Sequence, residues 1–192
     1  MASKPGERKL QILQTVAQML EQPKGEKITT AALAARLELS EAALYRHFAS
    51  KAQMFEGLIE FIEQTVFGLI NKITQEEKSG LRQADAIMAM LLGFAQKNRG
   101  MTRVLTGDAL VNEDERLQQR INQLLDRIEA TLKQSLRMAV TQGEMEESAD
   151  VGVHANLLVC CVIGRWQQFA KSGFVRDPAA QWPAQSAILL GK

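Results

Sequence analysis

The stretch that decides the fold is ITTAALAARLELSEAALYRHF, residues 28–48. Thr29 and Ser40 each precede a short run of good helix formers, and both residue types are favoured at a helix N-cap. The stretch therefore predicts two short helices joined by a tight turn. Ala34 and Ala35 are small enough for the second helix to cross close to the first. This arrangement is a helix-turn-helix, and its second helix, which begins at Ser40, is expected to enter the major groove of DNA.

The remaining residues of this stretch separate a core from an exposed face. The apolar positions expected to form the shared core are Leu33, Leu37, Leu39, Leu44 and Phe48. The second helix then turns outward a short polar face that carries one aromatic ring, formed by Ser40, Glu41, Ala42, Tyr45, Arg46 and His47. A face of this size and chemistry fits the major groove.

Three hydroxyl groups are candidates for contact with the DNA backbone. Thr29, Thr30 and Ser40 stand at predicted helix N-termini, where free backbone N–H groups also suit phosphate oxygens. A second interpretation is equally open for Thr29 and Ser40, because these residues cap helices whatever the function of the protein.

Five more residues have chemistry that suits DNA. Tyr45 and His47 can donate hydrogen bonds to phosphate, and Lys51 adds a positive charge. Ala42 is small enough to let the helix seat deeply against a thymine methyl group. Arg46 is a further candidate, although it can instead form a salt bridge with a nearby glutamate.

Composition and periodicity predict an all-helical protein for the rest of the chain. Apolar residues make up 46% of the 192 residues, Pro is rare at 4, and no segment alternates like a strand over more than four residues. Helices are expected at about residues 6–21, 50–76, 81–97, 101–108, 149–171 and 182–190, besides the two of the helix-turn-helix. A further long helix is expected around the apolar stripe from Leu117 to Leu136, ending at residues 142–144, and turns are expected at 22–25 and 98–100. These nine helices predict a DNA-binding domain at residues 1–51 and a helical dimerisation domain at residues 52–192.

The charge is distributed unevenly along the chain. The net charge is +1, yet residues 1–51 hold eight Lys and Arg side chains, among them Lys4, Lys24 and Lys27, against five Glu. A mildly basic N-terminal part suits contact with phosphate. The chain shows no signal-peptide pattern, and its longest apolar run, residues 157–163, is far shorter than the ~20 residues that span a bilayer. We therefore expect a protein that stays in the cytoplasm, without a membrane span.

Catalytic and cofactor chemistry is not indicated. The chain has no Glu-x-x-His pair, no phosphate loop and no nucleophile next to a base, so we expect no enzyme and no cofactor. Cys160 and Cys161 are adjacent in an apolar run and lack a second cysteine pair. They are expected to be reduced core residues, and not metal ligands.

The helix-turn-helix stretch resembles a known family. A threonine that opens the first helix, the sequence Tyr-Arg-His-Phe at residues 45–48 and the pair Ser50-Lys51 are similar to the hallmark of the TetR family of helical DNA-binding dimers. Residues 40–48, 58–63, 91–94 and 120–124 resemble, within that family, the nucleoid occlusion factors. The resemblance implies a dimer that binds palindromic sites in chromosomal double-stranded DNA, contacts the C-terminal tail of the division protein FtsZ and antagonises FtsZ rings over the nucleoid.

The same resemblance implies a surface for the FtsZ tail. The matching positions on the fourth and fifth predicted helices are Phe61, Met90, Gly93, Lys97 and Asn98. The apolar stripe of the fourth helix, which includes Phe55, Ile62 and Leu69, is expected to be buried. Phe61 lies off the centre of this stripe, which predicts partial exposure. The alternative is that Phe61 only packs against the next helix.

Four positions depart from the family pattern. Glu38 stands where such turns usually have Gly, and a positive φ there would store about 1 kcal/mol of strain. Ala49 replaces a common Pro. Ala32 lacks a basic side chain and Leu69 lacks a charge, which leaves the DNA site sequence and the FtsZ contact open.

A dimer is expected because two recognition helices are needed to read half-sites ~34 Å apart. The last two long helices are expected to supply the interface, with candidates Ala155, Leu158, Val162 and Phe169. These residues can instead fill the core of a single chain. The alternative function is a ligand-responsive TetR-type transcriptional repressor, in which an apolar pocket would use Met88, Met90 and Met101.

Overall fold

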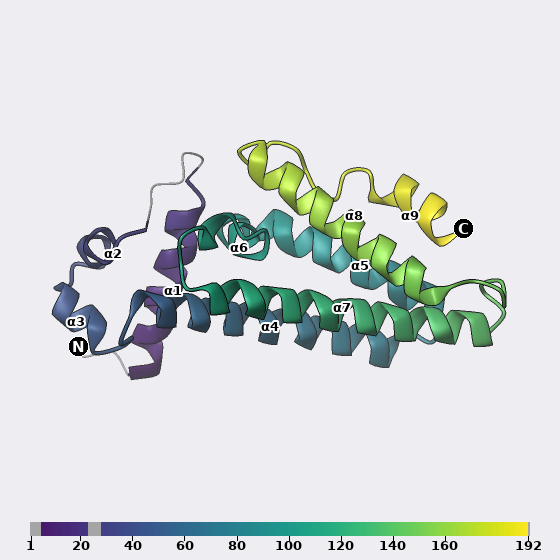
Figure 1. Cartoon of the computed structure of the whole chain (residues 1–192), viewed down its shortest axis with the longest axis horizontal. Coiled ribbons are helices and arrows are strands. Elements are labelled where there is room, and N and C mark those ends of the chain that lie inside the picture. Colours follow the sequence, from purple (N-terminus) through teal and green to yellow (C-terminus); the bar gives the residue numbers. More distant parts are fainter. Residues whose placement is uncertain (1–4, 23–27, 192) are drawn as a thin grey trace. The chain divides into compact units, whose positions relative to one another are not determined.

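The computed structural model describes residues 5–22 and 28–191, and every regular element in this part of the chain is helical (Figure 1). The predicted turn residues 23–25 and the basic residues Lys4, Lys24 and Lys27 lie outside the described residues. The elements are α1 (Pro5–Leu20), α2 (Thr30–Arg36), α3 (Glu41–Tyr45), α4 (Lys51–Glu76), α5 (Gly80–Lys97), α6 (Arg99–Leu105), the 3₁₀ helix η1 (Asp108–Leu110), α7 (Glu115–Thr141), α8 (Val151–Lys171) and α9 (Trp182–Leu190). The predicted all-α class is confirmed.

The chain folds as two compact units. The N-terminal unit comprises Met1–Ile62 and Asn98–Ile121, and the C-terminal unit comprises Glu63–Lys97 and Asn122–Lys192. The first helical stretch of the predicted 52–192 segment thus packs with the helix-turn-helix. The functional limit proposed at residue 51 stays a prediction.

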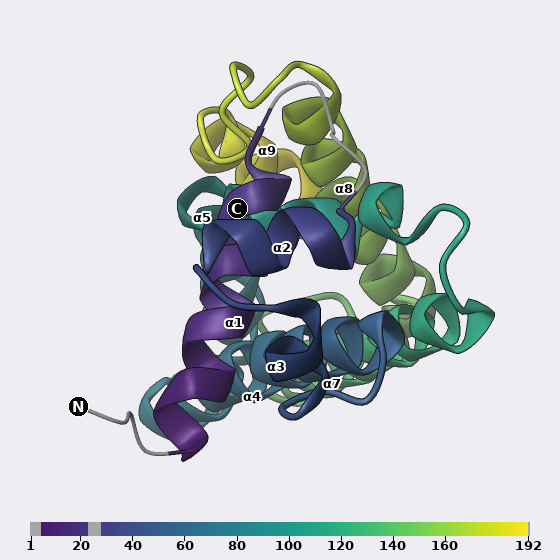
Figure 2. The same cartoon turned by 90° about the vertical axis from the view of Figure 1, so that its left-hand side faces the viewer.

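The N-terminal unit is built around α1, which contacts both α2 and α6 (Figure 2). The crossing of α1 and α6 is close, because a Cβ added to Gly100 would lie 1.9 Å from the carbonyl oxygen of Ala17. The sequence predicted a turn at residues 98–100 and a helix at 101–108. Instead α6 already begins at Arg99 and ends at Leu105, where Gly107 adopts a φ of 79° and starts the 3₁₀ turn. Gly100 is thus a contact residue within a helix, and not a turn residue.

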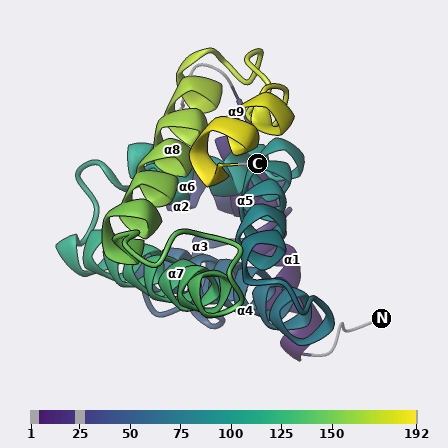
Figure 3. The same ribbon diagram turned by 90° about the vertical axis from the view of Figure 1, so that its right-hand side faces the viewer.

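The C-terminal unit packs α8 and α9 against α5 (Figure 3). The indole N–H of Trp166 donates to the carbonyl oxygen of Leu91 at 3.2 Å, and that of Trp182 donates to Oδ1 of Asp85 at 2.9 Å. Both tryptophans are buried. Two apolar rings therefore anchor α8 and α9 to α5 without leaving their polar atoms unsatisfied.

Two predictions of burial are wrong. Leu69 is exposed, and Ile70 takes its place in the core of α4. Cys160 is exposed and Cys161 is half-buried, because they lie toward the outward side of α8, opposite the buried positions Leu158 and Val162. None of the described helices is long and apolar enough to cross a membrane.

Candidate nucleic-acid interface

The two helices of the helix-turn-helix begin at the predicted caps. Oγ1 of Thr29 accepts the backbone N–H of Ala32 at 3.1 Å, and Oγ of Ser40 accepts that of Ala43 at 3.2 Å. Each hydroxyl satisfies one of the free N–H groups at its helix start. The capping role of both residues is therefore confirmed, while a phosphate contact by them stays a prediction.

The turn between the helices has the expected strained residue. Glu38 adopts a φ of 54°, in the left-handed region that favours glycine. The backbone N–H of Leu39 then donates to the carbonyl oxygen of Ala34 at 2.9 Å and closes the turn. The chain thus tolerates a cost of about 1 kcal/mol to place Ser40 at the start of the recognition helix.

Burial separates the two sides of the motif as predicted. Leu33, Leu44 and Phe48 are buried, whereas Leu39 is only half-buried. On the opposite side, the exposed residues are Ser40, Glu41, Ala42, Tyr45 and Arg46, and His47 is half-buried. The α-helix itself ends at Tyr45, and Arg46 and His47 form a final turn.

The tyrosine is the most prominent group on this face. Its side chain is 44% exposed, so the ring and the hydroxyl both reach solvent from a helix held by buried neighbours. Because α3 is anchored through Leu44 and Phe48, the face is held in place before any ligand arrives. Pre-organisation of this kind lowers the entropic cost of binding.

A hydrogen bond between two candidate contact residues ties α2 to α3. Oγ1 of Thr30 donates to Oε2 of Glu41 at 2.6 Å. Glu41 is one of the glutamates near Arg46 in the sequence, but in the structure its carboxylate accepts from Thr30. The two residues are eleven positions apart, so only the folded turn brings them together.

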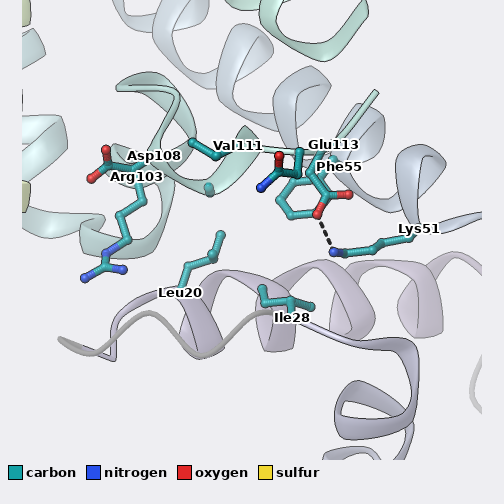
Figure 4. Close-up of a pocket in the computed structure, with 10 residues that line it drawn as sticks. Leu20, Ile28, Lys51, Phe55, Arg103, Asp108, Val111 and Glu113 are labelled. Atoms are coloured by element: carbon teal, nitrogen blue, oxygen red, sulfur yellow. Dashed lines mark hydrogen bonds and ion pairs between the residues drawn. The ribbon is translucent and has the colours of Figure 1, made fainter. Parts of the chain in front are cut away.

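Two basic side chains flank the motif. The ammonium group of Lys9, on α1, lies 5.6 Å from the ring centroid of Phe48. Lys9 was not among the DNA-contact residues predicted from the sequence. Lys51 is half-buried, and its ammonium group forms an ion pair with Glu113 (Figure 4). Glu113 lies 62 residues further along the chain, and no local sequence signal indicated it.

The candidate residues for a protein partner lie on helices α4 and α5 and just after α5. Phe61, on α4, is 38% exposed, as its position off the apolar stripe predicted. Met90, Gly93 and Lys97 follow one another on α5 at i, i+3 and i+7, and therefore share a face. A Cβ added to Gly93 would meet no atom within 4 Å, so this face is open at Gly93. Asn98 is the N-cap residue of α6.

The four candidate dimer residues occupy the core of the C-terminal unit. Each has a relative exposure of 2% or less: Ala155, Leu158, Val162 and Phe169. They fill the interior of one chain, which is the second of the two interpretations that the sequence left open. The outward side of α8 instead carries Val153, Leu157, Cys160 and Gly164 at helical spacing.

A helix-turn-helix with an exposed second helix, followed by a body that is helical throughout the described residues, is the architecture of a TetR-type regulator. Residues 17–58 match the family described as "Bacterial regulatory proteins, tetR family". Residues 78–192 match the SlmA-like family described as "Tetracyclin repressor-like, C-terminal domain". The chain belongs to the TetR family.

Curated relatives narrow the assignment. The chain is 51% identical over 186 residues to the nucleoid occlusion factor SlmA of Alteromonas mediterranea, covering 97% of this chain and 95% of the relative. It is 48% identical over 189 residues to SlmA of a Marinomonas species, covering 98% and 96%. Within the TetR family, the chain belongs to the SlmA group.

Solved structures agree on the fold. A TetR transcription regulator of Haloarcula marismortui superposes with a TM-score of 0.81 at 14% identity, covering 97% of both chains. The TetR family regulator PfmR of Thermus thermophilus superposes with a TM-score of 0.78 at 23% identity, covering 94% of this chain and 97% of that one. At these identities the similarity establishes the fold alone.

Proposed function

We propose that this protein is a nucleoid occlusion factor that binds palindromic chromosomal sites as a homodimer and antagonises FtsZ ring assembly over the nucleoid. The observation that carries the proposal is the exposed face of α3 in a chain about half identical, over nearly its full length, to curated nucleoid occlusion factors. The protein acts in the cytoplasm, on the nucleoid, and it needs neither a catalytic residue nor a cofactor.

DNA is bound through two kinds of contact. Residues at the helix starts and flanks hold the phosphate backbone, with Thr29, Thr30, Ser40, Tyr45, His47 and Lys51 as the contacts. Glu41, Ala42 and Arg46, which are exposed on or just after α3, face the base edges. Phosphate contacts fix the register of the helix, and base contacts supply the sequence preference.

The dimer forms through the outward side of α8. Leu157 is 49% exposed, Val153 is more exposed still, and Gly164 has open space where a side chain would be. An apolar helix face with a small residue lets a second copy of the same helix approach closely. The symmetry of such a dimer places two recognition helices on one palindrome.

Leu157→Glu is expected to convert the dimer to a monomer at micromolar concentration, because it places a charge on both sides of a symmetric apolar contact. Sedimentation velocity measures the change. Leu10→Glu on α1, where the leucine is similarly exposed, is the matched control and is expected to stay dimeric. A monomeric wild-type protein contradicts the dimer, and a dimeric Leu157→Glu protein contradicts this face.

The FtsZ tail binds at Phe61, Met90, Gly93, Lys97 and Asn98. The three residues on α5 give an apolar side chain, a gap and a positive charge along one face, which suits a short peptide with apolar and acidic groups. A short peptide obtains most of its affinity from a few such anchor contacts.

A labelled peptide of the FtsZ tail is expected to bind more tightly when a palindromic duplex is present, as measured by fluorescence anisotropy. Gly93→Gln is expected to weaken this binding more than about tenfold, since the new side chain fills the gap without meeting the rest of the chain. Phe61→Ala is expected to weaken it as well. Ala130→Gln, at an exposed position on α7, is the control. Absence of peptide binding with and without DNA favours the ligand-responsive repressor.

The repressor alternative receives no specific support from the structure. Met88, which such a pocket would use, is fully buried against its neighbours. One cavity, beside the C-terminal end of α8, is lined mainly by polar side chains such as Arg165, Gln168 and Arg176. A second, beside residues 108–113, mixes apolar side chains with charged ones, among them Lys51 and Glu113. Neither cavity matches the apolar pocket that the alternative requires.

A further inference from the structure

Lys51 is held at the point where the recognition motif joins the rest of the N-terminal unit. It is the first residue of α4 and comes three residues after Phe48. Its ammonium group pairs with the carboxylate of Glu113 and lies 5.6 Å from the ring centroid of Phe55. The side chains of Lys51 and Glu113 are 22% and 12% exposed, so water screens this pair less than a surface pair.

Glu113 belongs to the connection between α6 and α7, residues 106–114. Two residues there have a positive φ, Gly107 at 79° and Asn112 at 64°. The neighbouring Asp114 is engaged by the guanidinium of Arg116 through hydrogen bonds of 2.7 and 3.1 Å, which lower the pKa of Asp114 to about 2. Asp114 is thus satisfied within its own segment, and Glu113 is the carboxylate that faces Lys51.

A cavity lies beside the connection between α6 and α7. A cavity of about 250 Å³ is lined by Phe55 and by Arg103, Asp108, Val111 and Glu113 (Figure 4). Val111 is an exposed apolar residue at its edge. Leu110 holds the middle of this segment in the core, but the side chain of Glu113 borders the cavity and can rotate away from Lys51 without displacing packed residues.

The pairing conflicts with the role proposed for Lys51. An ammonium group whose charge is balanced by a carboxylate attracts a phosphate much less than a free one does. We propose that Glu113 is a latch: without DNA it holds Lys51, and a DNA phosphate displaces it, which frees the 108–113 segment. This inference rests on the proposed DNA binding and adds a conformational consequence of it.

The proposal is tested by removing the negative charge of Glu113. Glu113→Gln keeps the size of the side chain and is expected to bind a duplex about three- to tenfold more tightly than wild type, because the phosphate no longer competes with a carboxylate for Lys51. Glu115→Gln is the matched control, since it removes a neighbouring exposed negative charge that does not contact Lys51 in the structure. Equal gains for the two variants would show a net-charge effect and overturn the latch.

The second experiment substitutes Lys51. Lys51→Met is expected to reduce the slope of log affinity of the dimer against log salt by about 1.8, which corresponds to one phosphate contact fewer in each protomer. In that background Glu113→Gln is expected to have no further effect. A gain that persists without Lys51, or a Glu113→Gln protein that binds no more tightly than wild type, overturns the proposal.

Amide hydrogen exchange measures directly whether residues 108–113 become more mobile. DNA is expected to speed amide exchange at residues 108–113 of the wild-type protein, and Glu113→Gln is expected to exchange quickly there without DNA. Unchanged exchange on DNA binding overturns the proposal. All arms are run on an unrelated duplex as well as a palindrome, because phosphate contacts do not depend on sequence. Failure of the proposed function appears separately, as equal affinity of the wild type for the two duplexes.

Discussion

A protein with alanine at both Tyr45 and His47 is expected to lose specific binding to a palindromic duplex, with a fall in affinity of more than about 100-fold at constant salt. Each residue is expected to donate a hydrogen bond to phosphate, and a hydrogen bond to a charged group is worth roughly 1.5–3 kcal/mol. Removing two such hydrogen bonds from each recognition helix of the dimer therefore exceeds the factor of about 100. The fold is expected to survive, because Tyr45 is 44% exposed and His47 is half-buried.

The composition of the chain sharpens this experiment. His47 and His154 are its two histidines and Tyr45 is its one tyrosine, so single substitutions assign every imidazole and phenol signal in an NMR spectrum. DNA is expected to shift the His47 signal and to leave that of His154, on α8, unchanged. His154→Ala is the control for affinity, and circular dichroism checks the helix content. Retained specific affinity in the double variant would show that α3 is not the recognition helix.

The parts of the site that are local in sequence could be predicted before the structure. Thr29 and Ser40 cap their helices, and Glu38 has a positive φ, because caps and turns depend on residues within three or four positions. The exposure of Tyr45 and Phe61 followed from helical spacing in the same way. A periodic pattern predicts which side of a helix is apolar, and in these helices that side is buried, apart from Leu69 on α4.

The parts that depend on distant residues could not be predicted. Glu113 reaches Lys51 across 62 residues, and no pattern near either residue identifies the other. The apolar residues of α8 surround much of the helix, so periodicity could not decide which side the chain itself buries. Leu158 and Val162 were for that reason candidates both for a dimer interface and for the core of one chain, whereas Leu157 and Cys160 are the residues left outward. Burial there depends on where α5 packs.

Gly100 is a third case of long-range dependence, and it leads to the second large effect. Gly100→Ala is expected to destabilise the protein by about 2–3 kcal/mol, although alanine is the better helix former. The added Cβ would lie 1.9 Å from the carbonyl oxygen of Ala17 and 2.8 Å from its carbonyl carbon. These are backbone atoms of α1, which cannot rotate away as the end of a side chain can, so α1 and α6 must move apart. Urea denaturation measures the decrease in the free energy of unfolding.

Gly68→Ala is the matched control, and its expected effect has the opposite sign. Gly68 also lies inside a helix, but an added Cβ meets no atom within 4 Å. Alanine there is expected to stabilise the protein by about 0.5–1 kcal/mol, the difference in helix propensity. If Gly100→Ala were as stable as Gly68→Ala, the α1–α6 contact would not be as close as described. Since α1 also contacts α2, a widened crossing is expected to lower DNA affinity too, which would link the packing at Gly100 to the placement of the recognition helix.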